Sequence, residues 1–293
     1  MASSSLLKRA RPLRGVLLFL CALLLFACLD TTTKYLSQRY PVTMIVWMRY
    51  VVHALLMAVV LLPSKGMTLM RTHRTGLVWV RALSLAAMSL LMGLGLQRLP
   101  VAEATSIGFT APMLVVLLAR PVLGERIGWL RGGAVALGFI GVLLVARPGG
   151  SLDLFGVAVV LCAAVCGAAY QLLSRVLSSS ERAVTMLFYT ALAGCAIFGP
   201  LMPWLWGGPP PSWLDVLLFA SLGFYGGLGH LFFTQAYRYA PASLLAPVSY
   251  LQLLWAALTG FIVLGHVPEP MALLGMLVIM VSGALVAVGA SRG

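Results

Sequence analysis

The sequence repeats itself across its midpoint. Residues 99–126 read LPVAEATSIGFTAPMLVVLLARPVLGER, and residues 240–266 read APASLLAPVSYLQLLWAALTGFIVLGH. In both stretches a polar run leads into an apolar run that ends at glycine. Pro100 corresponds to Pro241 and Gly124 to Gly265, and the offset along the chain is the same for both pairs. Because this offset is close to half of the 293-residue chain, the sequence predicts two related halves.

Composition places these halves in a membrane. Hydrophobic residues make up 61% of the chain and charged residues only 9%, whereas a soluble domain has about 25% charged residues. The net charge of +13 comes from short basic clusters between long apolar runs, which indicates membrane topology and argues against nucleic-acid binding. All five cysteines fall within apolar runs, so we expect neither a disulfide framework nor a metal site.

An apolar helix needs about 20 residues to cross the hydrocarbon core, and the sequence contains ten such stretches. The first follows a short charged segment, as in a signal peptide, but it is longer and has no evident cleavage site. The ten expected spans are 14–36, 43–62, 76–97, 101–120, 130–147, 154–174, 184–204, 213–236, 242–264 and 270–290.

The basic residues predict how these spans are oriented. With a cytoplasmic N-terminus, 14 Lys and Arg residues fall on the cytoplasmic side and four fall outside, namely Lys34, Arg39, Arg98 and Arg147. This bias over short loops predicts that both termini are cytoplasmic.

The repeat extends over most of the chain, because Val42-Thr43-Met44 recurs as Val184-Thr185-Met186. We therefore expect a cytoplasmic N-terminal tail (1–13), a first five-helix repeat (14–147) and a second five-helix repeat (154–290). Since five is odd, the second repeat enters the membrane from the opposite side, an inverted-topology arrangement found in many secondary transporters. The expected fold is an all-α integral membrane protein with ten transmembrane helices.

Two charges of opposite sign are expected inside the membrane. Asp30 lies about 16 residues into the first span and Arg49 about seven residues into the second, which runs back, so both have similar depth in the outer half. A charged side chain at the centre of the bilayer costs about 2.5–3.5 kcal/mol, so we expect the two charges to pair. The pair either lies at the outer end of a central cavity, where a substrate or proton could open it, or has a purely structural role. Lys34, one turn after Asp30, is an alternative partner. Arg81 either snorkels to the interface or lines the inner mouth of a cavity.

Polar and aromatic side chains gather in spans six to nine. Such groups suit a site that stacks on and hydrogen-bonds a small organic molecule, and the interfacial aromatic belt is the alternative for several of them. His53 and His230 are interpreted as packing residues, with proton coupling as the alternative. No catalytic or phosphate-binding motif is present, so we expect neither an enzyme nor a cofactor. The candidate binding residues of these spans are Tyr170, Gln171, Gln235, Tyr250, Gln252 and Trp255.

The chain resembles the drug/metabolite transporter (DMT) superfamily, and within it the EamA-type ten-helix transporters. The opening motifs DTTTKYL at 30–36 and RYP at 39–41 look like the subgroup near bacterial S-adenosylmethionine and riboflavin transporters. The resemblance otherwise rests on LPVAEAT at 99–105, FTAP at 109–112, LGER at 123–126, GFIGVLLVARPG at 138–149 and APASLLAPVSYLQLLWAAL at 240–258.

This resemblance implies a transporter of the inner membrane with a central cavity on a pseudo-symmetry axis. The second repeat departs from the usual LGE ending, because His266 follows Leu264 and Gly265. If the acidic residue of the LGE ending has a gating role, it is in doubt whether the second repeat has an equivalent of that residue. Carried onto this sequence, the implied cavity residues are Asp30, Arg81, Ser84, Met88, Thr105, Phe109, Tyr170, Gln171, Gln235, Tyr250 and Gln252.

The predicted function is secondary transport across a bacterial inner membrane by alternating access. The substrate is expected to be a small polar or amphipathic metabolite, such as an amino acid derivative, a nucleoside-like compound or a vitamin-like compound. The proton is the candidate coupling ion, through Asp30 or Glu103, with facilitated carriage and exchange as alternatives. Import, export and oligomeric state stay open. An intramembrane enzyme and a non-transporting membrane interaction protein are the alternatives from other classes.

Overall fold

The computed structural model describes residues 2–66, 70–123, 129–147, 152–177, 180–240, 245 and 248–291; within these ranges helices are joined by turns and loops, and there is no strand. Most of the start of the expected span 242–264, the motif residues 124–126 and the joint between the halves at 148–151 lie outside them. The first half contains α1 (Ala2–Leu36), α2 (Val42–Lys65), α3 (Thr75–Arg98), α4 (Val101–Gly108), α5 (Thr110–Leu123) and α6 (Trp129–Ala146). The second half contains α7 (Leu154–Leu177), α8 (Ala183–Phe198), η2 (Gly199–Leu201), α9 (Met202–Leu205), α10 (Trp213–Tyr239), α12 (Leu251–Leu264) and α13 (Pro270–Ser291).

Seven helical stretches of the described chain are long and apolar enough to cross a membrane. Three further apolar helices are shorter, at 132–146, 251–264 and 270–286. Because these three helices are too short to confirm a membrane crossing by length alone, the predicted total of ten spans stays a prediction. The seven long stretches are Leu13–Leu36, Val42–Val60, Thr75–Arg98, Val101–Leu118, Leu154–Leu177, Ala183–Leu205 and Trp213–Ala236.

The expected span 101–120 is interrupted at Phe109, where α4 ends and α5 begins. Pro112 accounts for the interruption, because a proline ring collides with the carbonyl group four residues earlier, here Gly108, and supplies no N–H to it. The backbone N–H of Phe109 still bonds to the carbonyl groups of Thr105 (3.1 Å) and Ser106 (3.2 Å). The backbone at Phe109 stays in the right-handed helical region, with φ −64° and ψ −5°, so α4 and α5 follow one another without a loop.

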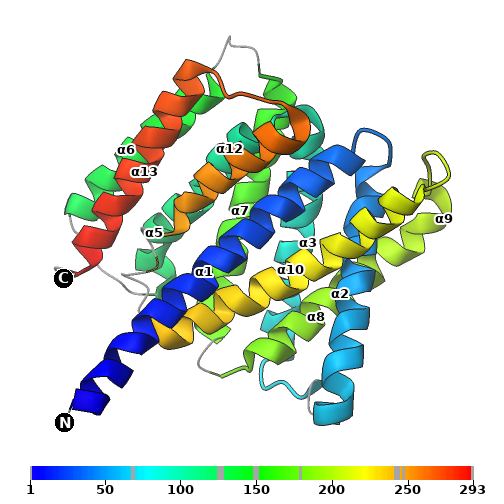
Figure 1. Cartoon of the computed structure of the whole chain (residues 1–293), viewed down its shortest axis with the longest axis horizontal. Coiled ribbons are helices and arrows are strands. Elements are labelled where there is room, and N and C mark those ends of the chain that lie inside the picture. Colours follow the sequence, from blue (N-terminus) through cyan, green and yellow to red (C-terminus); the bar gives the residue numbers. More distant parts are fainter. Residues whose placement is uncertain are drawn as a thin grey trace.

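The two halves correspond in the structure as well as in the sequence. Both ends of α5 and α12 keep the offset of the sequence repeat, since Thr110 matches Leu251 and Leu123 matches Leu264. The helix packing repeats in the same way: α1 packs on α10 as α7 packs on α3, while α6 packs on α13 and α2 on α8 (Figure 1). Exchanging the halves maps this set of contacts onto itself, as expected for a pseudo-twofold arrangement.

Glycines allow the equivalent helices to approach closely. A Cβ atom on Gly141 of α6 would lie 2.9 Å from the carbonyl oxygen of Gly275 on α13, and one on Gly275 would lie 2.7 Å from that of Gly141. Ser282 of α13 also donates a hydrogen bond to the carbonyl oxygen of Ala134 at 2.6 Å. Small residues at crossing points are a common means of helix association in membranes.

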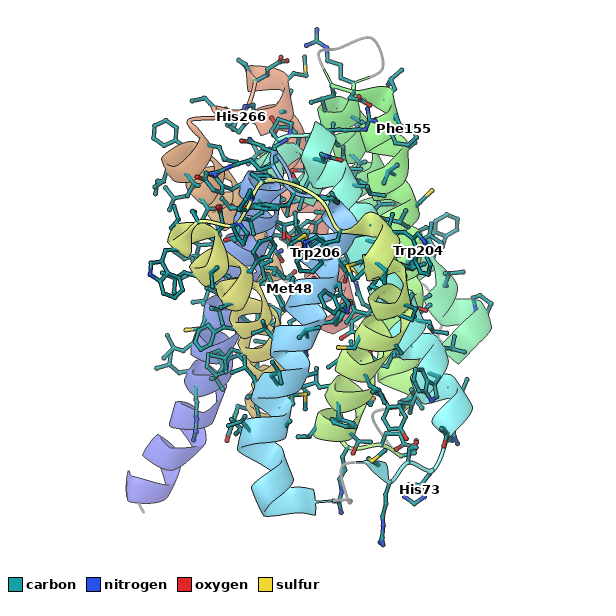
Figure 2. The ribbon with its side chains drawn as sticks, turned by 90° about the vertical axis from the view of Figure 1, so that its right-hand side faces the viewer. Met48, His73, Phe155, Trp204, Trp206 and His266 are labelled. Carbon is teal, nitrogen blue, oxygen red and sulfur yellow. The ribbon has the colours of Figure 1, made fainter. Side chains whose placement is uncertain are left out.

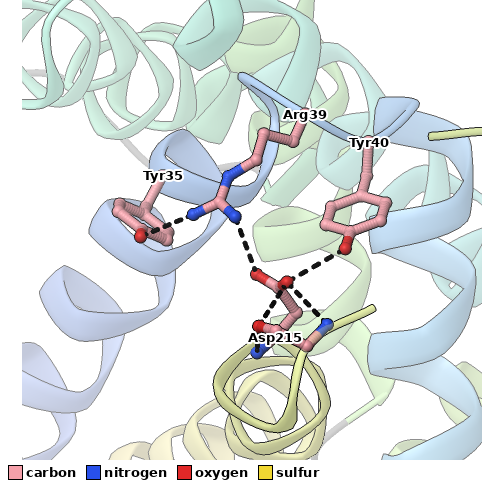
Figure 3. A network of polar contacts seen from close by, with 5 residues as sticks. Tyr35, Arg39, Tyr40 and Asp215 are labelled. Carbon is pink, nitrogen blue, oxygen red and sulfur yellow. Dashed lines mark hydrogen bonds and ion pairs between the residues drawn. The ribbon is translucent and has the colours of Figure 1, made fainter. Parts of the chain in front are cut away.

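A buried carboxylate fixes the start of α10 to the loop between α1 and α2 (Figure 3). Asp215 accepts hydrogen bonds from the Ser212 backbone N–H (3.0 Å) and hydroxyl (2.7 Å) and from the Tyr40 hydroxyl (3.1 Å), and its own backbone N–H donates to Ser212 Oγ (3.2 Å), which completes a capping box. Arg39 lies 3.6 Å from the same carboxylate and also donates to Tyr35. The first and second halves are therefore joined at this end of the bundle by charge-assisted contacts.

A second carboxylate joins two loops at the opposite end, where His73 lies far from His266 (Figure 2). Glu181 accepts hydrogen bonds from the Thr72 hydroxyl (3.0 Å) and from the backbone N–H groups of His73 and Arg74 (both 2.8 Å). Burial alone raises the pKa of Glu181, but these hydrogen bonds outweigh burial and hold that pKa below its ordinary value. Because folding lowers this pKa, the contact adds stability at neutral pH and loses it as the pH falls through the lowered value.

Candidate functional site

The structure brings Asp30 and Arg49 to one internal cavity of about 20 Å³, which is about the size of a single water molecule. Among the described residues their charged atoms do not come within the 4.0 Å of an ion pair, so the predicted direct pair is not formed. Lys34 is not the partner of Asp30 either, since it donates to the carbonyl oxygen of Gln97 at 3.3 Å. The cavity is lined by Asp30, Thr33, Ile45, Val46, Arg49, Ser89, Met92, Gly93 and Leu96.

Arg49 is held in place by α3 and by its own helix. Its Nη2 donates to Ser89 Oγ at 2.5 Å, and its guanidinium lies 4.5 Å from the centre of the Tyr50 ring. Tyr50 is itself fixed, because its hydroxyl bonds to Ser89 Oγ (2.9 Å) and to the Leu85 carbonyl oxygen (3.3 Å). Gly226 of α10 leaves room for the arginine side chain, whose Cδ lies 3.6 Å from where a Cβ would stand. One edge of the guanidinium is therefore anchored, while the rest faces the cavity.

Arg81 occupies a different place and is fully bonded. Only 4% of it is exposed, so the snorkelling interpretation is wrong. It donates to Ser174 (2.7 Å), Tyr170 (3.0 Å), Thr190 (3.2 Å) and the Met186 carbonyl oxygen (3.2 Å), and its guanidinium lies 4.5 Å from the Tyr170 ring centre. These partners come from α7 and α8, so Arg81 ties α3 of the first half to the second half.

The two interior histidines pack against neighbouring helices. His230 packs against Phe26 and Tyr170, with ring centres 5.0 Å and 6.1 Å apart. His53 is buried, and its ring lies against Gly227. Through Tyr170, which also accepts a hydrogen bond from Arg81, His230 belongs to the surroundings of that arginine.

Two equivalent aromatic residues meet at the centre of the molecule. Phe109 and Tyr250, which are related by the offset of the repeat, stack with ring centres 5.1 Å apart and an interplanar angle of 28°. Each stands immediately before an equivalent helix, α5 or α12. A contact between equivalent residues must lie on the axis that relates the halves, so the stack marks the pseudo-twofold axis.

Polar groups of α4 and the start of α5 are buried without partners. Glu103 Oε2, Thr105 Oγ1 and Thr110 Oγ1 have no hydrogen-bond partner within the described chain. A buried polar atom without a partner costs about 1–3 kcal/mol, and such atoms in a native structure call for an explanation. Glu103 and Thr105 precede the Phe109 break and Thr110 follows it, so the unpartnered atoms lie on both sides of the break.

An open vestibule of about 430 Å³ lies at the end of the bundle where α1 and α3 end and α4 begins. Arg98 on its wall pairs with Asp153 at 3.0 Å; the Gly156 backbone N–H and then Arg98 lower the pKa of Asp153. None of the described lining residues is acidic, so the vestibule is basic. It is lined by Lys34, Tyr35, Gln38, Arg98, Pro100, Val263, Leu264 and His266.

Two contacts between the halves close the bundle beneath this vestibule. His266 Nε2 lies 3.1 Å from Glu103 Oε1, and Glu103 is only 2% exposed. Thr31 of α1 donates to Thr259 of α12 at 2.8 Å. His266, which stands where the LGE pattern has glutamate, thus contacts Glu103 of the other half.

The remaining predicted residues are more scattered. Met88 packs against Gly167, Ser84 bonds to its own helix at Val80, and Trp255 packs with the cluster around Phe19. Gln171, Gln235 and Gln252 are half-buried. None of these six lines the Asp30–Arg49 cavity.

Comparison with known proteins settles the family. The sequence pattern of the EamA-like transporter family matches residues 13–147 and again residues 154–288. The chain belongs to the EamA-like transporter family. The resemblance found in the sequence is therefore confirmed, and the chain is a multi-pass membrane protein of a family of metabolite transporters.

Several relatives of this EamA-like transporter carry names that state a substrate. The S-adenosylmethionine uptake transporter of Rickettsia felis is 27% identical over 271 residues, covering 92% of this chain and 90% of the relative. The riboflavin transporter of Rhizobium johnstonii is 27% identical, with 92% and 90% covered. The pseudopaline exporter CntI of Pseudomonas aeruginosa is 26% identical, with 92% and 94% covered. A solved crystal structure shares the fold, with a TM-score of 0.70 at 18% identity over 95% of this chain and 98% of that chain.

The sequence did not single out Ser89, Ser174, Thr190 or Thr259 of this EamA-like transporter. Serine and threonine are common at helix contacts in membranes, so their presence alone carries little signal. They become informative only through their partners, Arg49, Arg81 and Thr31.

We expect Tyr250→Ala to weaken ligand binding by about tenfold, because it removes the stack with Phe109, worth about 0.5–1.5 kcal/mol beyond burial. Titration of the purified EamA-like transporter with its ligand measures the change, and Trp204→Ala, at an exposed aromatic residue outside the candidate site, is the control. Equal ligand affinity in Tyr250→Ala and in the unmodified protein would show that the stack is not part of the binding site.

Proposed function

We propose that this chain is a secondary transporter that moves a small polar or amphipathic organic metabolite across a bacterial inner membrane by alternating access. The observation that carries the proposal is the cavity containing Asp30 and Arg49, two opposite charges held inside an apolar bundle. Ionisable groups inside a membrane are costly and mark substrate or ion pathways. A transporter needs such a cavity for the passage of its substrate or ion, whereas a protein that only packs in the membrane does not need one.

In this proposal two inverted five-helix repeats move against one another about the Phe109–Tyr250 stack. The vestibule end faces outward and both termini face the cytoplasm, as the basic residues predict. The Thr31–Thr259 and Glu103–His266 contacts join the halves beneath the vestibule, so they act as the outer gate in this closed state. Opening the gate requires both contacts to break.

Glu103 is the favoured site of proton coupling. One of its carboxylate oxygens contacts His266 and the other has no partner in the described chain. A proton on this carboxylate removes the charge that holds the histidine, which loosens the gate. Asp30 is the second candidate, because it faces the cavity.

Uptake and export are both candidate directions. Relatives named as an uptake transporter and as an exporter cover this chain to the same extent. S-adenosylmethionine and riboflavin, which the names of relatives give, are the first substrates to test.

Purified protein in proteoliposomes tests the proposal directly. We expect the vesicles to accumulate labelled S-adenosylmethionine or riboflavin faster than empty vesicles, and a pH gradient to change the rate. Preloaded vesicles test export in the same preparation. If neither compound crosses the bilayer faster than in empty vesicles, in either direction, these two substrates are ruled out; if a wider panel of metabolites behaves in the same way, transport itself is contradicted.

A further inference from the structure

Three exposed arginines surround a buried carboxylate at the end of the bundle that is predicted to be cytoplasmic, the end marked by His73 in Figure 2. The carboxylate is that of Glu181, which accepts hydrogen bonds from the backbone N–H groups of His73 and Arg74. Arg182 follows Glu181 directly, and Arg71 lies two residues before His73. The side chains of these arginines form no hydrogen bond or ion pair within the described chain. We call Arg71, Arg74 and Arg182 the arginine cluster.

The protein fixes the backbone that carries this cluster. Glu181 holds residues 72–74 through hydrogen bonds of 2.8 Å and 3.0 Å, and the Tyr189 hydroxyl of α8 donates to the Met70 carbonyl oxygen at 3.0 Å. The backbone is therefore anchored on both sides of Arg71. Because Glu181 binds backbone N–H groups and a hydroxyl and not the guanidinium groups, the guanidinium groups stay available to a ligand.

An apolar face of α3 begins directly after the cluster. Leu77, Val80 and Leu83 are all exposed, and their spacing of three residues places them along one side of the helix. In a membrane this side faces the acyl chains of the lipids. The half-buried Trp79 in the first turns of α3 is typical of the boundary between acyl chains and head groups. The cluster and the apolar face together form an amphipathic surface, with its charge at the membrane boundary.

Exposed arginines at the vestibule end of the bundle are engaged with acids. Arg98 pairs with Asp153 at 3.0 Å, and Arg147 pairs with Glu269 at 3.7 Å. Each of these positive charges is neutralised by a partner on the same surface. The arginine cluster has no such partner within the described chain, so it attracts an external anion more strongly.

We propose that the arginine cluster and the exposed face of α3 bind an anionic phospholipid of the inner leaflet, with the phosphate on the arginines and an acyl chain along Leu77, Val80 and Leu83. Guanidinium groups form forked, charge-assisted hydrogen bonds with phosphate oxygens. Clusters of basic residues on the cytoplasmic side of a span attract anionic lipids. This surface lies on the outside of the bundle, away from the Asp30–Arg49 cavity, so the inference goes beyond the proposed transport function and does not depend on it.

The bound phosphate would join the two halves of the chain. Arg71 and Arg74 belong to the first half and Arg182 to the second, and Glu181 already brings their backbones together. One phosphate that accepts from both sides adds a second contact at the same place. We therefore expect anionic lipid to raise the melting temperature of the protein as well as to bind it.

Titration of the purified full chain with lipid tests the inference. Phosphatidylglycerol is added to the protein in a neutral detergent, and bound lipid is counted by native mass spectrometry. Phosphatidylcholine lacks the net negative charge, whereas sn-glycerol 3-phosphate and inorganic phosphate lack acyl chains. We expect phosphatidylglycerol to bind about tenfold or more tightly than each of these probes, and less tightly as salt rises. Equal affinity for phosphatidylcholine would overturn recognition of the charge, and equal affinity for either free phosphate would overturn recognition of a lipid.

Arginine variants assign the charge to the cluster. Arg71→Gln and Arg74→Gln are each expected to weaken phosphatidylglycerol binding about fivefold, which corresponds to about 1 kcal/mol, and together about 25-fold. Arg147→Gln removes an exposed arginine at the opposite end and is expected to bind the lipid as the unmodified protein does. Unchanged affinity in the double variant would overturn the proposed site.

Glu181→Ala distinguishes an ordered site from a general attraction between charges. The variant loses a negative charge, so it should bind anionic lipid more tightly if net charge alone decides. It also releases residues 72–74, so we expect about fivefold weaker binding, because the arginines are no longer held in place. The melting temperature without lipid shows whether the variant is folded. Tighter binding by the folded variant would overturn the role of Glu181 as a positioning residue.

Discussion

Gly194→Ala is expected to cause a large loss of stability. The new Cβ would collide with three atoms of the Tyr50 ring. Tyr50 is 1% exposed and cannot turn aside without losing its bonds to Ser89 and Leu85. Overpacking a well-packed core costs about 1–3 kcal/mol, and we expect a value at the upper end because α2 and α8 must separate.

Thermal unfolding of the purified variant, followed by the amount of monodisperse protein, measures this effect. Gly133→Ala is a matched control, because it adds the same methyl group to α6 where no atom lies within 4 Å. The control is expected to be neutral or slightly stabilising, since alanine favours a helix by about 1 kcal/mol over glycine. Equal melting temperatures for the two variants would contradict the close contact between α2 and α8.

Glu103→Gln is expected to abolish the response of transport to pH. Glutamine resembles the protonated carboxyl group, so the variant keeps the shape of the contact with His266 and loses its charge. A charged hydrogen bond contributes about 1.5–3 kcal/mol, and we expect about a tenfold reduction in proton-driven uptake. The other groups that face His266 across the vestibule are Lys34, Arg98 and Tyr35.

The measurement is uptake into proteoliposomes between pH 5 and pH 8. With Glu103 present, uptake is expected to change with the outside pH, because a proton on this carboxylate removes its charge from the contact with His266; with glutamine the profile is expected to be flat. Glu269→Gln, an exposed acid three residues beyond His266, is the control and should keep the slope. An unchanged slope in Glu103→Gln would exclude this residue from coupling.

The repeat explains how much of the architecture the sequence could predict. One constant offset relates Phe109 to Tyr250 and α5 to α12, and the structure keeps it at both ends of the helices. The break at Phe109 follows from Pro112 by local chemistry, although the sequence interpretation treated 101–120 as one span. The family could also be predicted, because its motifs are contiguous in the chain.

Contacts between residues that are not equivalent could not be predicted in this way. Glu103 and His266 are separated by 163 residues and Thr31 and Thr259 by 228, so neither pair follows the repeat. The positions of Asp30 and Arg49 along their helices predicted that the two residues lie at similar depth in the membrane. They did not predict the rotation of each helix about its axis, which decides whether the two charges are in contact. The position of Arg81 near a span end left two interpretations open for the same reason, because it said nothing about the hydroxyl groups that surround the side chain.

The Phe109–Tyr250 stack makes the two sides of the pseudo-twofold axis chemically different. If the two halves were identical, this contact would join one residue to its own copy, and both rings would be the same. In this chain one of the two positions carries a hydroxyl group, and that ring packs against α13 at Gly283. The two halves are therefore not interchangeable at the point where they meet.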